Sequence, residues 1–112
     1  MQLLNDLTGL TGQAQNYLDP PANGTLPLLS KAAFAHTITG VKGLKVTAGT
    51  CTIGVQINGV GVTGLASLAV TTTSQDATAT ALNAVAAGDA VTLVISAVSG
   101  ATGLQFVGTS TR

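Results

Sequence analysis

Residues 51–62 read CTIGVQINGVGV and carry the clearest structural signal in the chain. Apolar residues occupy every second position from Cys51 to Ile57, and Thr, Gly and Gln fill the positions between them. This period of two is typical of a β-strand with one buried face. Asn58-Gly59 follows, and both residues tolerate the positive φ that a type I′ turn requires. The stretch therefore predicts a β-hairpin.

Similar short runs of alternating or β-prone residues lie on both sides of this hairpin. They cover residues 34–39, 44–47, 68–72, 77–82, 90–96 and 104–108. We expect turns or loops at Gly40–Gly43, Ala86–Asp89 and Ser99–Gly103. About seven or eight short strands without helix-length segments between them predict an all-β fold, an antiparallel β-sandwich of jelly-roll type. A β-helix is the weaker alternative, because the chain has no fixed repeat.

The most β-prone run, residues 90–96, is apolar on both faces. Leu93 and Ile95 share one face, while Val94 and Val98 add apolar surface to the other. A strand of this kind lies either at the centre of the core or at a subunit interface.

The composition narrows the function classes. The 112 residues fit one domain, with 46% hydrophobic, 3% aromatic and only 7% charged residues, against about 25% charged in an average soluble domain. No apolar run reaches the roughly 18 residues of a membrane-spanning helix. The few Lys and Arg residues are not clustered as nucleic-acid binding requires. Because so neutral a surface repels its copies little, we expect a homo-oligomer, with neither nucleic acid nor membrane as a partner.

The composition changes near residue 30, which divides the chain into an N-terminal segment, 1–30, and a β-sandwich domain, 31–112. The segment contains all three prolines and the turn-rich stretch DPPANG at 19–24. It predicts an extended arm that becomes ordered on a partner, with a floppy terminus as the alternative. The expected partner-binding anchors of the arm are Leu3, Leu4, Leu7, Leu10, Tyr17 and Leu18. Met1–Asp6 lacks the features of a secretory signal.

Residues that could carry chemistry are few. The chain has one His, one Cys and no Glu. Cys51 is expected to be a buried small hydrophobe, and His36 a core or interface residue. A Cys51/His36 dyad and a metal ion held by His36 on a three-fold axis are minor alternatives. The aspartates are far apart in sequence and do not form a calcium loop. We therefore expect no enzyme activity, cofactor or metal site.

Two short motifs do not change this view. Residues 59–64, GVGVTG, fit the GxGxxG pattern but follow a hairpin turn instead of opening a helix, so the geometry of a dinucleotide site is missing. Asn23-Gly24-Thr25 fits the glycosylation sequon, which has no weight without an export signal.

Several stretches occur here in an order that resembles a module of tailed-bacteriophage virion proteins. They read GTCTIGVQINGVGVTG at 49–64, VTTT at 70–73, AAGDAVTLVIS at 86–96 and LQF at 104–106. The resemblance covers residues 31–112. Proteins with this module include head fibres, head decoration proteins and tail-fibre ends. It implies a β-sandwich, often jelly-roll-like, that forms a homotrimer.

Together these observations predict a structural virion protein, either a capsid decoration (cement) protein or a head fibre. It would be made in the cytoplasm of the host bacterium, sit on the surface of the phage particle, and dock through residues 1–30 on the major capsid protein or another virion protein. The alternative is a tail-fibre or baseplate module that binds a host-surface glycan. An enzyme is the third and weakest hypothesis.

Overall fold

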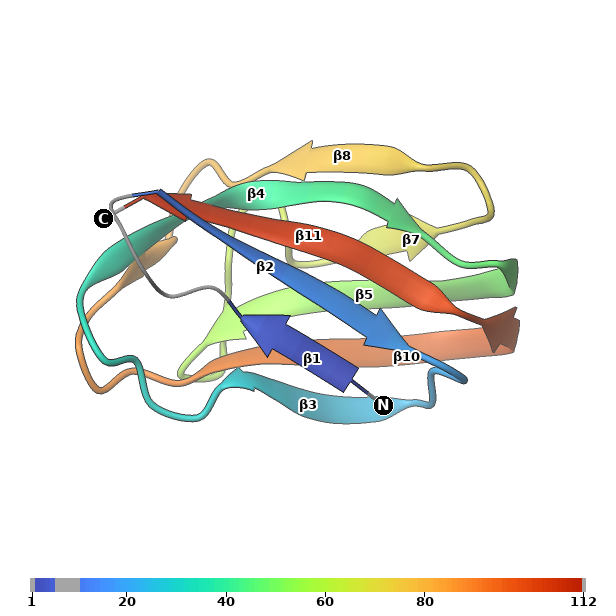
Figure 1. The fold of residues 1–112 in the computed structure, drawn as a ribbon, viewed down its shortest axis with the longest axis horizontal. Helices are drawn as coiled ribbons and strands as arrows, with labels where there is room; N and C mark the ends of the chain where they lie inside the picture. The colour runs from blue at the N-terminus through green and yellow to red at the C-terminus, as the bar shows by residue number, and fades with distance from the viewer. Residues whose placement is uncertain (1, 6–10, 112) are drawn as a thin grey trace.

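A computed structural model describes residues 2–5 and 11–111, which form two antiparallel β-sheets packed face to face (Figure 1). The predicted all-β sandwich is confirmed. The described residues contain no helix, and so none that could cross a membrane. The strands are β1 (Gln2–Asn5), β2 (Thr11–Leu18), β3 (Gly24–Leu29), β4 (His36–Lys45), β5 (Ala48–Ile57), β6 (Val60–Gly61), β7 (Leu68–Val70), β8 (Gln75–Thr78), β9 (Ala84–Val85), β10 (Val91–Thr102) and β11 (Leu104–Thr111).

Strands near the start of the chain pair with strands near its end, and the strands between them pair with one another inside that outer set. In the six-stranded sheet the order is β1-β2-β11-β4-β8, and β9 also pairs with β4. In the five-stranded sheet the order is β3-β10-β5-β6, and β7 also pairs with β5. Thus β2 pairs with β11, β3 with β10, β4 with β8 and β9, and β5 with β6 and β7. A long two-stranded ribbon rolled into two sheets in this way is a jelly roll.

The hairpin predicted at residues 51–62 is present. Ile57 pairs with Val60, and the turn residues Asn58 and Gly59 have φ values of 50° and 82°. Two positive φ values in a two-residue loop are the mark of a type I′ turn.

Two strands are longer than predicted because bulges interrupt their alternation. β4 is continuous through Gly40–Gly43, where the sequence suggested a break between two strands. β10 continues through most of the loop expected at Ser99–Gly103, with register shifts and with Ala97 and Gly100 at φ values of 51° and 60°. A β-bulge accepts a residue at positive φ, and the strand pairing resumes beyond it. The glycines that suggested turns therefore lie at bulges inside continuous strands.

The N-terminal segment also differs from the expected arm. β2 pairs with β11 over eight residues, and β3 pairs with β10. Leu26, Leu28 and Leu29 of β3 pack against the core. β3 lies before the boundary expected near residue 30, yet it belongs to the sandwich and not to a separate arm. Pro27 signalled an arm in the sequence, but β3 is an edge strand, where a residue without an N–H is tolerated.

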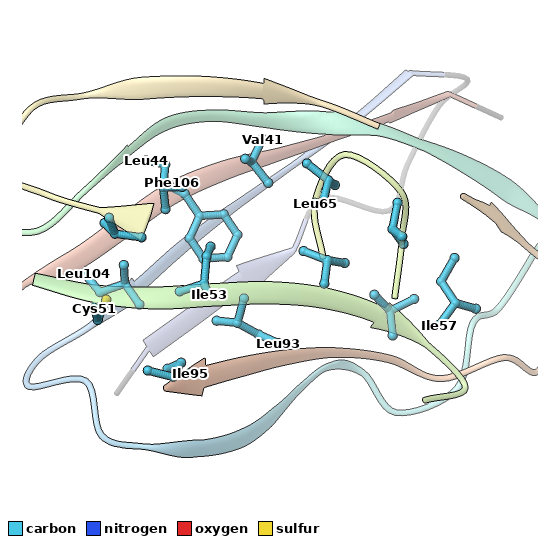
Figure 2. Close-up of a cluster of buried hydrophobic side chains, with 14 of the residues drawn as sticks. Val41, Leu44, Cys51, Ile53, Ile57, Leu65, Leu93, Ile95, Leu104 and Phe106 are labelled. Atoms are coloured by element: carbon cyan, nitrogen blue, oxygen red, sulfur yellow. The ribbon is translucent and has the colours of Figure 1, made fainter. Parts of the chain in front are cut away.

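The core lies between the sheets, and both sheets contribute to it (Figure 2). Its largest fully buried side chains include Leu44, Ile53, Leu93 and Leu104, with the ring of Phe106 between the layers. Leu65 enters from the loop between β6 and β7 and is 0% exposed. Few aromatic residues are needed because Leu, Ile and Val fill the interior.

Candidate functional site

Cys51 is a buried strand residue. It lies in β5 opposite Val70 and is 3% exposed. Burial raises the pKa of its thiol, which disfavours the thiolate that reacts with electrophiles or metals. Cys51 therefore behaves as a small hydrophobe, as the sequence suggested.

His36 lies at the start of β4, away from Cys51. Its Nδ1 is 3.1 Å from the backbone oxygen of Phe34, and its ring meets that of Phe34 edge to face at 5.7 Å. β4 runs nine residues beyond His36 before β5 turns back, and Cys51 is three residues into β5. At about 3.3 Å per residue the two side chains are separated by roughly 20 Å along the strands, so they cannot form a dyad.

A hydrogen-bonded cluster joins the β5–β6 turn to the loop before β10. The carboxylate of Asp89 accepts from the backbone N–H of Ala86 and from the side-chain amide of Asn58, both at 2.9 Å. These two bonds hold the pKa of Asp89 below its ordinary value. The Asn58 side-chain oxygen accepts from the N–H of Ala90 at 2.9 Å. The cluster braces the fold, and its polar groups are already engaged.

The expected partner-binding anchors do not share one environment. The side chain of Tyr17 is 41% exposed, and its hydroxyl donates to Asp19 Oδ2 at 3.4 Å. Leu18 is half-buried and packs against the core. Leu3 and Leu4 lie in β1, which pairs with β2 at the edge of the six-stranded sheet. Leu7 and Leu10 lie outside the described residues.

The outer surface of the six-stranded sheet carries two lysines. Lys45 pairs with Gln105, Lys42 pairs with Val107, and the register shifts by one residue between them. Residues three apart in a regular strand face opposite ways, but the bulge at Gly43, with φ 63°, turns both lysines outward. We call this surface, made by Tyr17, Lys42, Lys45, Gln105 and Val107, the lysine face.

A carboxylate at the edge of this surface supports the bulge. Asp76 of β8 accepts a hydrogen bond from the Gly43 N–H through Oδ1 at 3.0 Å. The lysine face therefore has charges of both signs in and beside it. The sequence analysis expected a turn at Gly40–Gly43, which gave Lys42 no place on a sheet face, whereas β4 continues through this stretch with a bulge at Gly43.

The outer surface of the five-stranded sheet has a different composition. Leu93 and Ile95 of β10 point into the core, so the residues between and beside them face outward. Cross-strand pairs extend this surface over three strands. The outward positions are Thr25, Pro27, Thr52, Gly54, Gln56, Thr92, Val94 and Ser96. None of these residues is charged, and we call their surface the uncharged face.

The described part of the chain contains no group of three or more His, Cys and acidic residues placed to hold a metal ion. The two outer faces differ in charge, since lysines lie on one and no charged residue lies among the named positions of the other. No protein-family model, curated protein or solved structure gives a significant match to this chain.

Proposed function

We propose that this chain is a structural protein of a bacteriophage particle, a capsid decoration or head-fibre protein that acts as a homotrimer on the virion surface. Its partners are copies of itself and the major capsid protein or another virion protein. It is made in the cytoplasm of the host bacterium.

The observation that carries the proposal is the pair of unlike faces on a jelly roll. Cores of protein–protein interfaces are depleted in charged residues, and the uncharged face has that composition. The lysine face, with Tyr17 exposed in it, leaves a second surface for a different protein. Two faces of this kind suit a subunit that binds its own copies and also a shell. The resemblance of the sequence motifs to phage virion modules, described above, points to the same function.

Attachment to the particle is proposed for the N-terminal hairpin of β1 and β2. β3 is less suited, because it is hydrogen-bonded into the five-stranded sheet and packs leucines on the core. Among the described strands, β1 lies at the edge of the six-stranded sheet and pairs with β2 alone. Leu3 and Leu4 of β1, together with exposed Tyr17, remain the proposed anchors.

Immunogold labelling of purified phage particles with an antibody against this chain tests the proposal. Dense label over the heads, with many copies per particle by quantitative mass spectrometry, is the expected result. Label confined to the tail tip, with a few dozen copies or fewer, would favour the alternative below. Absence of the chain from particles produced by cells that express it would contradict a virion role.

The alternative is a tail-fibre or baseplate module that binds a host-surface glycan. One observation favours it. Tyr17, Gln105 and Lys45 form one cross-strand row on the lysine face, so an exposed ring, an amide and an ammonium group lie side by side. Aromatic rings and hydrogen-bonding side chains are suitable groups for sugar recognition. Binding to a glycan array that is lost in Tyr17→Ala would support this function.

A further inference from the structure

We infer that Asn23-Gly24 is a site of spontaneous deamidation in the folded chain, and that the hydrogen bonds of Asn58 protect the second such pair, Asn58-Gly59. These are the two places in the sequence where glycine follows asparagine. The inference concerns a covalent modification and does not depend on the proposed function. It predicts where the folded protein acquires a negative charge with time.

Deamidation of asparagine is an intramolecular reaction whose only co-reactant is water. The backbone nitrogen of the following residue loses its proton and attacks the side-chain Cγ, the Cγ–Nδ2 bond breaks, and Nδ2 leaves as ammonia. Water then opens the succinimide ring at either carbonyl, which gives aspartate or isoaspartate. Glycine is the most favourable following residue, because it has no Cβ beside the attacking nitrogen and its backbone is the least restricted. The rate therefore depends on how freely the asparagine amide can turn toward that nitrogen.

The two pairs have similar surroundings apart from the asparagine amides. Both asparagines and both glycines are exposed. Apart from chain neighbours, no atom lies within 4 Å of the place where a Cβ would stand on Gly24 or Gly59. Water reaches both pairs, and neither glycine is hindered. A difference in reactivity therefore arises mainly from the contacts of the two amides.

The Asn58 amide is held at both of its polar atoms. Its Nδ2 donates to Asp89 Oδ1, and its Oδ1 accepts from the Ala90 N–H, both at 2.9 Å. The backbone N–H of Asn58 also donates to the Ala90 carbonyl at 2.8 Å. To bring Cγ to the Gly59 nitrogen, the amide must leave both side-chain partners. Losing two hydrogen bonds, one of them to a carboxylate, should slow the reaction at least about tenfold.

The Asn23 amide is held at one polar atom. Its Oδ1 accepts from the Val98 N–H at 3.2 Å, and among the described residues its Nδ2 has no hydrogen-bond partner. Gly24 is the first residue of β3 and forms the terminal pair with β10, opposite Ile95. The end of an edge strand opens more easily than its middle. The Asn23 side chain can therefore turn toward the Gly24 nitrogen at little cost.

The fold also accepts the two products unequally. An aspartate at position 23 keeps a side-chain oxygen for the Val98 N–H. An aspartate at position 58 would place a carboxylate where Asn58 now donates to Asp89, and like charges so close repel each other. Deamidation at Asn23 therefore gives a negative charge to a chain whose formal net charge is zero, while the fold is kept.

The experiment follows both sites by mass spectrometry while the full chain is incubated at mildly alkaline pH, either folded in buffer or unfolded in urea. Trypsin places the two sites on different peptides, because Lys31, Lys42 and Lys45 lie between them. The urea sample measures the effect of the flanking residues alone. In the folded chain we expect Asn23 to react at least about tenfold faster than Asn58, after division by the ratio of the two rates in urea.

Two aspartate variants test the cause of the protection. Asp89→Ala removes the acceptor of the Asn58 amide, so it should accelerate deamidation at Asn58 and leave the rate at Asn23 unchanged. Asp76→Ala is the matched control, because Asp76 also accepts from a backbone N–H, that of Gly43, but lies in β8 of the other sheet. It should change neither rate. Thermal melting checks that both variants are folded, and the comparison with urea requires no variant.

The outcomes decide the inference without reference to assembly or to phage particles. A preference for Asn23 that disappears in urea supports it, as does acceleration at Asn58 by Asp89→Ala alone. Equal rates in the folded chain, a faster reaction at Asn58, or no reaction at Asn23 overturns it. A preference that persists unchanged in urea also overturns it, because the flanking residues would then be the cause. A folded Asp89→Ala chain in which Asn58 reacts as slowly as before overturns the protective role of the hydrogen bonds.

Discussion

Asn58 shows how one residue can serve two segments of the fold. It adopts φ 50° in the β5–β6 turn, and its side chain also binds Asp89 and the backbone of Ala90. Asp89 in turn caps the N–H of Ala86 in the turn before β10. The AAGDAVTL stretch therefore has a structural explanation: its aspartate closes a turn and ties it to a hairpin distant in sequence.

The acid sensitivity of folding should change when Asp89 is replaced by Asn. The folded-state pKa of Asp89 is lowered by hydrogen bonds from Ala86 and Asn58, so its carboxylate stabilises the fold above its ordinary pKa. That contribution disappears as the pH falls through the folded-state value. Urea unfolding at pH 7 and pH 3 should show Asp89→Asn less stable than the unmodified chain at pH 7, with the difference reduced at pH 3.

Leu65→Ala is a suitable reference for this experiment, because its effect arises from lost packing and not from proton binding. Removing a fully buried leucine costs about 2–5 kcal/mol of unfolding free energy. Its loss of stability should be similar at the two pH values. A pH-independent difference for Asp89→Asn as well would contradict the assigned role of the carboxylate.

At the scale of the element, the β6–β7 loop depends on a glycine in the neighbouring strand. Leu65 accepts a hydrogen bond from the Val55 N–H at 2.8 Å and inserts its side chain into the core. The next residue, Ala66, brings its carbonyl over Gly54. A Cβ at position 54 would overlap this carbonyl oxygen, so the absence of a side chain there allows the loop to close against β5.

Gly54→Ala should therefore destabilise the fold by about 1–3 kcal/mol, the usual cost of overpacking a close contact. Thr52→Ala is the matched control, since Thr52 lies two residues earlier in β5 and also faces outward. Its effect should be well below that of Gly54→Ala in chemical denaturation. Equal effects would show that the carbonyl contact does not set the position of the loop.

The strand from Cys51 to Ile57 was predictable from its unbroken alternation, whereas the alternating run at 77–82 is a strand only as far as Thr78. Beyond a bulge, alternation assigns side chains to the wrong face of the sheet, because the one extra residue reverses the side on which every later residue lies. The uncharged face could be partly predicted, since Val94 was recognised as apolar on the side of its strand opposite Leu93. The lysine face was not predicted, because a turn was expected at Gly40–Gly43 where β4 continues through a bulge.

At the scale of the whole molecule, the N-terminal strands depend on partners at the other end of the chain. β2 pairs with β11, and β3 pairs with β10. Nothing in residues 11–29 indicates which distant strands they pair with. The prolines and small polar residues of this stretch are as typical of an extended arm as of an edge strand. This is why the sandwich was predictable while the membership of its first strands was not.

Removal of residues 1–30 tests the importance of these strands. The deletion would strip β10 and β11 of one neighbour each and expose core surface now covered by Leu18, Leu26 and Leu29. We expect a loss of several kcal/mol, comparable to the whole stability of a typical domain of about 5–15 kcal/mol. Circular dichroism and urea unfolding of residues 31–112 provide the measurement. A fragment that unfolds cooperatively with nearly unchanged stability would restore the independent domain expected from the sequence.

The nested strand order also governs how the protein can be made. β10 and β11 occupy the middle of the two sheets, yet a ribosome synthesises them after every other strand. During translation, β3 has no partner until β10 appears, and β2 has only β1 beside it until β11 appears. The nascent chain therefore carries unpaired strand edges, which favour aggregation, for most of its synthesis. Rapid completion of the chain, or protection by a chaperone, would shorten the time for which these edges are exposed.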